Sequence, residues 1–279
     1  MDMRQLMYFV EVAQQQSFTK AAEKLNISQP ALSKCIHNLE DELGTSLFVR
    51  KAGTITITDT GKIVLEKAKD LIVHFDYVQN TFRLINPQNK KNISIGCSPI
   101  LSSVIDIDKL EAFLSDNNKI YMSYGGGTIN QLVNMVFSMK IDMAICILYD
   151  REYKYLDKVN TEVIYEGKVI YASSGNIDES SKFVTSCDLS ACFRSEDDPK
   201  VNHTTLYTDY ANEIKRMVYY KGFTAIVPDI VLSYWDKDVN TASFVPSINY
   251  RIALITNKSM KCSKIIQQLK KHIKNNIDL

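Results

Sequence analysis

Residues 17–43 read SFTKAAEKLNISQPALSKCIHNLEDEL and contain the pattern of two short amphipathic helices joined by a tight polar turn. The first helix, with Ser17 or Thr19 as its N-cap, places apolar side chains on one face at Phe18, Ala21, Ala22 and Leu25. Asn26 tolerates the left-handed conformation that ends a helix, and Ser28 can cap a second helix whose first turn accepts Pro30. Two helices joined in this way predict a helix-turn-helix.

The second helix is expected to bury one face and to present the other outward. Its apolar residues recur at helical spacing, namely Leu32, Cys35, Ile36, Leu39 and Leu43. Its first turns contain no acidic residue, and its outer face carries Gln29, Ser33, Lys34, His37 and Asn38. A short helix with a polar, acid-free outer face suits the major groove of DNA.

Bulk charge does not argue for DNA binding. The chain has a net charge of +1, from 33 Lys and Arg residues against 32 Asp and Glu residues. Residues 1–58 are balanced as well, with Arg4, Lys20, Lys24, Lys34, Arg50 and Lys51 against Asp2, Glu11, Glu23, Glu40, Asp41 and Glu42. Because a nucleic-acid reader usually shows a basic surface, a positive field here has to come from the placement of the charges.

Two further elements flank the central stretch. A first helix, which Asp2 can cap, repeats Leu6, Phe9, Val10 and Ala13 at helical spacing. Residues 47–58 read as a β-hairpin with a Gly-containing turn, which would form a wing. Arg50 at the end of the first strand is expected to face phosphate or a narrow minor groove; the alternative is a solvated strand end.

A long helix is predicted from Thr58, as its cap, to about Ile85. Its apolar residues alternate at spacings of four and three, as in a coiled coil: Val64, Ala68, Leu71, Phe75, Val78 and Phe82. We expect this seam to form a homodimer, because paired half-sites on DNA need a partner related by two-fold symmetry. The alternative is that the seam packs on the second domain of the same chain.

Beyond a polar linker at residues 86–92, short apolar strands alternate with helices, which predicts an α/β unit with a parallel sheet. Strands are expected at 93–97, 119–124 and 143–147, with helices at 101–114 and 128–139. A second such unit has expected strands at 163–165, 168–172, 191–194, 222–228, 239–245 and 251–256, and helices at 209–220 and 259–277. If the chain returns to the first unit near Thr256, the product is a two-lobed body with a cleft.

Residues 18–50, FTKAAEKLNISQPALSKCIHNLEDELGTSLFVR, followed by Thr58 and Gly61, resemble the DNA-binding region of LysR-type transcriptional regulators. Looser similarity at 140–145 (KIDMAI) and 218–228 (VYYKGFTAIVP) extends the resemblance over the whole chain. The resemblance implies an α-helical winged helix-turn-helix (residues 1–58), a linker and dimerisation helix (59–86), a hinge (87–92) and a periplasmic-binding-protein-like α/β effector domain (93–279). Subdomain I would comprise about 93–160 and 257–279, and subdomain II about 161–256.

The resemblance also implies a function: binding of double-stranded promoter DNA as a homodimer or homotetramer, modulation by a small-molecule effector in the cleft, and a possible contact with RNA polymerase. The DNA-binding residues implied are Ser28, Gln29, Pro30, Ser33, Lys34, His37, Arg50 and Lys51. Most members of the family have Arg where Lys34 stands. Lysine is a point charge without the bidentate fork of arginine, so it matches a guanine edge less closely.

Cleft residues in such an architecture come from strand ends and from the helix starts that follow them. The expected set is Ser98, Pro99, Ile100, Ser102, Gly127, Thr128, Cys146, Ile147, Phe193, Arg194, Phe223 and Thr224. Free N–H groups after Gly125-Gly126-Gly127 could bind a carboxylate or phosphate; the alternative is a loop that only needs glycine's conformational freedom. The expected effector is a small organic anion or an amino-acid-like molecule.

Other classes of protein fit less well. The sequence has no run of about 18 apolar residues and no secretory layout at its start, so a cytoplasmic protein without membrane contact is expected. An enzyme, a metal or a cofactor is not expected, because His37, His74, His203 and His272 are isolated and no catalytic motif is present. Two alternatives remain: thiol sensing through Cys187 and Cys192, and a two-lobed small-molecule-binding protein without a regulatory role.

Overall fold

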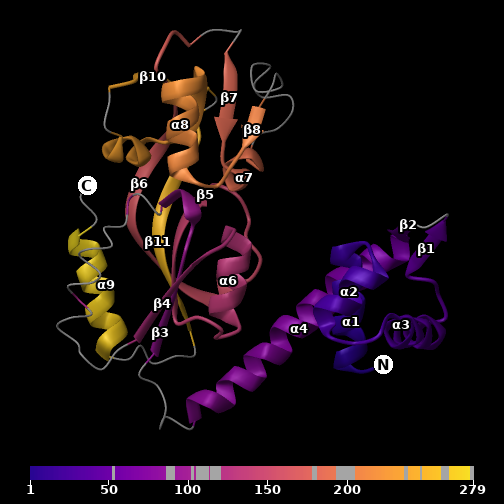
Figure 1. Cartoon of the computed structure of the whole chain (residues 1–279). Coiled ribbons are helices and arrows are strands. Elements are labelled where there is room, and N and C mark those ends of the chain that lie inside the picture. The colour runs from indigo at the N-terminus through magenta and orange to yellow at the C-terminus, as the bar shows by residue number, and fades with distance from the viewer. Residues whose placement is uncertain are drawn as a thin grey trace. The chain divides into compact units, whose positions relative to one another are not determined.

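The computed structural model describes residues 1–51, 54–85, 92–101, 104, 113, 121–177, 181–192, 205–235, 238–245, 247–258 and 264–276. The chain divides into two compact units, Met1–Phe82 and Arg83–Leu279, each of which has its own hydrophobic core. The two units are described separately below (Figure 1).

The N-terminal unit begins with three helices: α1 (Met3–Gln15), α2 (Phe18–Leu25) and α3 (Gln29–Leu43). The side chains of Asp2, Ser17 and Ser28 each accept a hydrogen bond from a backbone N–H of the helix that they cap. Asn26 and Gly44 end α2 and α3 in the left-handed conformation. The helix-turn-helix and all of its predicted caps, Asn26 included, are therefore confirmed.

The core of this unit explains which residues of α3 face inward. Leu32, Ile36 and Leu39 are completely buried against α1 and α2. The stripe predicted for α3 is too wide, because Cys35 is half-buried and Leu43 is exposed. Leu43 is the last residue of the helix, where the chain leaves the core.

The wing follows as β1 (Phe48–Lys51) paired antiparallel with β2 (Thr54–Ile57), and then comes helix α4 (Asp59–Ile85). The wing and α4 meet at Gly61, where a Cβ atom would lie 2.3 Å from the Leu47 carbonyl oxygen. Thr58 Oγ1 donates to the Ser46 carbonyl oxygen at 2.9 Å and accepts from the Gly61 N–H at 2.8 Å. Thr58 and Gly61 together thus fix where α4 starts against the wing.

The heptad seam of α4 divides into two parts. Ala68 is only 1% exposed and belongs to the core of the N-terminal unit, against which Val64 also packs. The prediction that Ala68 serves a partner helix is therefore wrong, because the chain's own core already covers its side chain. Leu71, Phe75 and Val78 are 49%, 36% and 51% exposed. The Phe82 side chain lies outside the described residues.

In the C-terminal unit, the first lobe contains β3 (Asn92–Cys97), β4 (Tyr121–Gly126), α6 (Ile129–Phe137), β5 (Met143–Tyr149), β11 (Asn249–Asn257) and α9 (Lys264–Asn276). Strands β4, β3 and β5 are parallel, and β11 runs antiparallel to β5. Helices α6 and α9 lie on either side of this sheet (Figure 1). Because both faces are covered, every residue of β5 is buried.

The second lobe contains β7 (Lys182–Thr185), α7 (Cys187–Ser190), β8 (Thr205–Tyr207), α8 (Ala211–Lys221), β9 (Phe223–Pro228) and β10 (Asn240–Ser243). Three short 3-10 helices complete the unit: η2 (Pro99–Leu101), η3 (Leu156–Lys158) and η4 (Asp229–Tyr234). Strands β8, β7 and β9 are parallel to one another.

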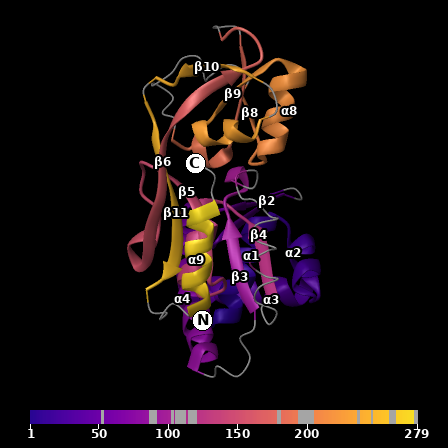
Figure 2. The ribbon, with the colours of Figure 1, turned by 90° about the vertical axis from the view of Figure 1, so that its left-hand side faces the viewer.

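Strand β6 (Val159–Ser173) belongs to both lobes. Its residues Val159–Lys168 pair with β11, and its residues Val169–Ser173 pair with β9. The long, adjacent courses of β6 and β11 are visible in Figure 2. The sheet order is β4-β3-β5-β11-β6-β9-β7-β8, with β10 added to β6.

The α/β character and most elements of this unit are confirmed, but several details are wrong. The strands expected at 163–165 and 168–172 are one strand, because β6 continues from one lobe to the other. No strand begins at Ala191: α7 occupies Cys187–Ser190, and Ala191 and Cys192 form a turn. The chain returns to the first lobe before Asn249, not near Thr256, because Tyr250–Thr256 already pair with β5. Most of the helix expected at 101–114 lies outside the described residues.

Candidate functional site

The outer face of α3 presents most of the residues predicted to read DNA. Ser28, Gln29, Pro30, Lys34 and His37 are exposed, and Ser33 is half-buried on the same side of the helix. The Ser28 side chain accepts from the Ala31 N–H at 3.4 Å, so it serves as a cap besides being exposed. The first turn of α3 has no acidic residue. A helix start with free N–H groups and no nearby carboxylate favours an approaching phosphate.

The acidic residues at the far end of α3 are held by the protein itself. One oxygen of Glu40 accepts hydrogen bonds from the backbone N–H groups of Leu47, at 2.6 Å, and Phe48, at 3.1 Å. Asp41 lies 3.7 Å from His37, and Glu42 pairs with the N-terminal ammonium group. Glu40 therefore fixes the start of the wing, and its charge is used within the protein instead of being presented on the outer face of α3.

The wing is anchored by aromatic contacts to the helices. The Phe48 ring lies 5.4 Å from the Phe9 ring and 6.0 Å from the Phe18 ring, centroid to centroid. In the hairpin, Arg50 is opposite Ile55 and Lys51 is opposite Thr54. The two basic residues thus lie at the tip end of the hairpin, while their side chains lie outside the described residues.

A cavity of about 420 Å³ lies between the two lobes of the C-terminal unit. The first lobe contributes the ends of β3 and β4 and the start of α6, and the second lobe contributes the residues before α8. Three predicted residues line this cavity, Pro99, Gly127 and Thr128, together with Gly126 of the glycine stretch that the sequence also pointed to. The other lining residues, which the sequence did not suggest, are Cys97, Gln131, Asp209 and Tyr210.

Five of the other predicted cleft residues face the core. Ser98, Ile100, Cys146, Ile147 and Thr224 are at most 3% exposed, and Phe223 packs partly against the same core. Ser98 Oγ accepts from the Ile147 N–H at 3.4 Å, and β5 is covered on both faces, so these side chains are not available to a ligand in the cavity. Ser102, Phe193 and Arg194 lie outside the described residues.

The start of α6, where the sequence suggested an anion site, already has a carboxylate bound to it. Asp188 of α7 accepts a hydrogen bond from the Ile129 N–H at 3.1 Å and lies 3.8 Å from the Arg151 guanidinium. Burial raises the pKa of Asp188, and the nearby Asp209 raises it further, against the lowering effects of Ile129 N–H and Arg151. Sequence patterns could not reveal this contact, because Asp188 and Ile129 are 59 residues apart and lie in different lobes.

The two cysteines at and just after α7, Cys187 and Cys192, are poorly placed for redox sensing. Cys187 is exposed and Cys192 is half-buried, and both are free thiols. Burial raises the pKa of both thiols, and carboxylates add to the effect: Asp209 and Asp188 at Cys187, and Asp188 and Asp150 at Cys192, where Arg151 opposes it. Since the thiolate is the reactive form, a raised pKa lowers reactivity at neutral pH.

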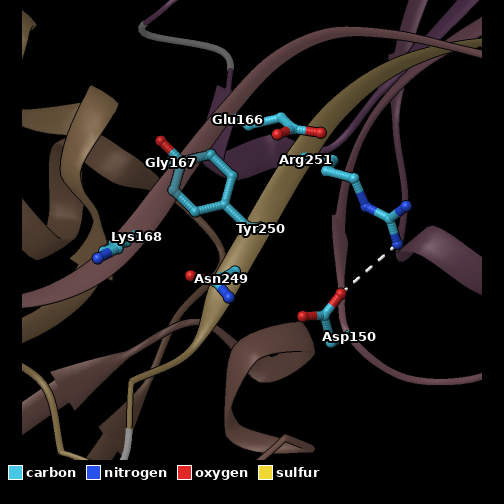
Figure 3. Close-up of a pocket in the computed structure, with 7 residues that line it drawn as sticks. All are labelled: Asp150, Glu166, Gly167, Lys168, Asn249, Tyr250 and Arg251. Carbon is cyan, nitrogen blue, oxygen red and sulfur yellow. Dashed lines mark ion pairs between the residues drawn. The ribbon is translucent and has the colours of Figure 1, made fainter.

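A second hollow, of about 490 Å³, lies where β6 and β11 run between the lobes (Figure 3). Its charged residues include Asp150 and Arg251, which form an ion pair at 3.5 Å. The Tyr250 hydroxyl donates to Asp229 at 2.5 Å, and a Cβ atom on Gly167 would lie 2.6 Å from each of these two groups. The absence of a side chain at Gly167 therefore lets β6 pass close to this hydrogen-bonded pair.

Among the described residues, no group of three or more His, Cys, Asp or Glu residues is placed to hold a metal ion. No helix among those residues is long and apolar enough to cross a membrane.

A winged helix-turn-helix followed by a long helix and a two-lobed α/β unit is the architecture of LysR-type regulators. Residues 3–62 match the family described as "Bacterial regulatory helix-turn-helix protein, lysR family". Residues 3–62 therefore form a helix-turn-helix domain of the lysR family.

Relatives and solved structures agree with this assignment. The chain is 38% identical over 95 residues to the HTH-type transcriptional regulator XapR of Escherichia coli, covering 34% of this chain and 32% of XapR. It is 28% identical over 182 residues to the HTH-type transcriptional regulator BsdA of Bacillus subtilis, covering 63% of this chain and 62% of BsdA. The chain thus covers less than two thirds of the length of these relatives.

The fold matches CbnR, a LysR family transcriptional regulator, with a TM-score of 0.53, 19% identity and 99% of both chains covered. Full-length CbnR complexed with its target DNA gives a TM-score of 0.52 at 18% identity, again with 99% of both chains covered. At this level of identity the likeness establishes the fold.

Proposed function

We propose that this protein is a DNA-binding transcriptional regulator of the LysR type that binds promoter DNA and responds to a small molecule in the interlobe cavity. The observation that carries the proposal is the outer face of α3, which is exposed, polar and free of acidic residues in its first turn. Reading DNA would place the protein in the cytoplasm, and the proposal involves no catalytic step.

In this proposal, Gln29, Ser33 and Lys34 contact base edges in the major groove, while Ser28 and Pro30 lie against the backbone at the start of α3. His37 and the wing residues Arg50 and Lys51 contact phosphate or the minor groove. Glu40 supports this arrangement because it orients the wing relative to α3 through Leu47 and Phe48.

We also propose that the exposed part of the α4 seam, from Leu71 through Phe75 to Val78, holds two chains together. Apolar side chains repeated on one face of an exposed helix are the pattern that a partner helix covers. A dimer formed in this way would present two copies of α3 to a two-fold-related DNA site. Assembly to a tetramer, and a contact with RNA polymerase, are extensions of the same proposal.

The test is genome-wide mapping of the DNA bound by the protein, followed by affinity measurements on the recovered sites. Enrichment of a small set of promoter fragments with a two-fold-related sequence supports the proposal. Equal affinity for recovered and random fragments, at the same salt concentration, contradicts it.

A further inference from the structure

Most backbone N–H groups at the start of α6 are already hydrogen-bonded within the protein. The Thr128 N–H donates to Gln131 Oε1 at 2.9 Å, the Gln131 N–H donates to Thr128 Oγ1, and the Ile129 N–H donates to Asp188. Three of the backbone donors at this helix start, the N–H groups of Thr128, Ile129 and Gln131, are therefore already used within the protein. An anionic ligand would have to displace the Asp188 carboxylate from Ile129.

Charged side chains near the cavity include Arg151, Asp188 and Asp209. Arg151 is paired with Asp188 and lies over the Tyr153 ring, 4.9 Å from its centroid. Among the described residues that line the cavity, Asp209 is the one with a charge. Asp209 accepts from the Cys187 N–H at 2.8 Å, and no basic side chain of the described residues pairs with it. Among the residues that the structure describes, the charge on the second-lobe side of the cavity is therefore negative.

The residue that follows Asp209 in the chain is aromatic. Tyr210 lines the same cavity and is 62% exposed, and its position directly before α8 fixes its backbone. A carboxylate and an aromatic ring that line one cavity are a combination that favours an organic cation, through charge pairing and cation–π attraction. The apolar Pro99 and the amide of Gln131 on the opposite wall suit the carbon skeleton and one further polar group.

We propose that the interlobe cavity binds a small molecule with a protonated amine, held by the Asp209 carboxylate and covered by the Tyr210 ring. This inference rests on the proposed function, since it names the class of effector for the same cavity. It replaces the organic anion expected from the sequence. An anion here would add a third negative charge near Asp188 and Asp209, and the charge of Asp209 already raises the pKa of Asp188.

The test uses the full chain and matched pairs of probes in isothermal titration calorimetry. Butylamine, hexane-1,6-diamine and 2-phenylethylamine are compared with butanoate, hexanedioate and phenylacetate, which have the same numbers of carbon atoms and the opposite charge. At least one amine is expected to bind at least tenfold more tightly than its carboxylate partner. Tighter binding of the carboxylates, or no binding by any of the amines, would overturn the proposal.

Variants locate the site. Asp209→Asn keeps an oxygen that can accept from the Cys187 N–H, so the fold is retained, and amine affinity should fall at least tenfold. Tyr210→Leu should weaken amine binding severalfold, and Tyr210→Phe should leave it unchanged. Asp150→Asn removes an exposed carboxylate at the second hollow, the one where β6 and β11 run between the lobes, and is the matched control. Equal losses in Asp209→Asn and Asp150→Asn would overturn the assignment of the site.

Asp188→Ala tests separately whether the Asp188 carboxylate keeps anions away from the start of α6, because the variant frees the Ile129 N–H and Arg151 from that carboxylate. In this variant a carboxylate probe should gain at least tenfold in affinity while amine binding persists. No gain, in a variant with unchanged circular dichroism, would contradict the role given to Asp188.

DNA binding is measured on the same preparations, so that the proposal of a DNA-binding regulator and the proposal of an amine effector are tested separately. If promoter DNA is bound and the amines are not, the effector class is wrong and the regulator proposal stands. If the amines bind and promoter DNA is not distinguished from random DNA, the regulator proposal is the one that fails.

Discussion

The helix-turn-helix and the interlobe cavity differ in how far apart their parts lie in the sequence. Each cap of α1, α2 and α3 is set by a residue three positions from its partner, and the core residues of α3 follow one helical period. The cavity instead combines residues near positions 97, 127 and 210, and its key contact joins Asp188 to Ile129. Local rules suffice for the first site, whereas the second exists only through tertiary structure.

The two regions also treat charge differently. In the N-terminal unit, acidic residues are held away from the outer face of α3, by the backbone at Glu40 and by the terminal ammonium at Glu42. In the cavity, acidic residues lie at the site itself, with Asp188 bound to α6 and Asp209 facing the space. We thus propose an anion for the outer face of α3 and a cation for the cavity, and the experiments below test each half of that contrast.

The largest effect is expected from Leu71→Asp or Phe75→Asp, which should convert the proposed dimer to monomers. A carboxylate buried without a partner costs several kcal/mol, and the two-fold symmetry of a dimer would introduce it twice. Sedimentation velocity measures the outcome. Ile63→Asp, on the same helix and 66% exposed, is the control that should leave the assembly intact. An unchanged assembly in the Leu71 variant would refute the role of the seam.

Next in size is Gly61→Ala, which tests how the wing is joined to α4. The added methyl group would lie 2.3 Å from the Leu47 carbonyl oxygen and 2.7 Å from an Ile57 side-chain atom. Overpacking of this kind typically costs about 1–3 kcal/mol. Chemical denaturation of the full chain, followed through the N-terminal unit, should show this loss. Gly175→Ala, where no atom lies within 4 Å of the new methyl group, should be nearly neutral.

A smaller effect, on specificity, is expected from Gln29→Ala. Loss of one contact to a base edge reduces discrimination by about 1–3 kcal/mol, while binding to random DNA should change little. Affinities for recovered and random fragments give the comparison. Gln14→Ala removes an exposed glutamine from α1, away from the reading helix, and should leave both affinities unchanged. Equal weakening on both kinds of DNA by the Gln29 variant would argue against direct readout.

The sequence was sufficient for the helices of the N-terminal unit because period and caps are local. It failed at Ala68, since the same heptad spacing serves both an internal core and a partner helix, and spacing cannot tell them apart. Thr58 and Gly61 marked the start of the long helix in the sequence. The reason for their positions, the close approach to Leu47, is visible only in three dimensions.

In the C-terminal unit, strands and helices could be predicted but side-chain directions could not. Pro99, Gly127 and Thr128 line the cavity because they follow strand ends, whereas Cys146 and Ile147 are inside a strand covered on both faces. Asp209 and Tyr210 carried no motif, and their importance depends on α8 meeting the first lobe. Arg151 and Asp188 were missed for the same reason, since ion pairs between distant segments leave no periodic signal.

The smallest effect is a change in pH dependence, and it bears on the cavity. Burial raises the pKa of Asp188 in the folded protein, so folding favours its protonated form. The corresponding stability is present below the unfolded pKa and is lost as the pH rises through the folded pKa. The variant Asp188→Asn keeps an acceptor for the Ile129 N–H but cannot ionise, so this loss of stability should disappear. Between about pH 4 and neutrality, the free energy of unfolding of the variant should therefore rise relative to that of the wild type. Denaturant titrations at several pH values measure that difference, and a constant value would show that Asp188 is as well solvated as an ordinary surface carboxylate.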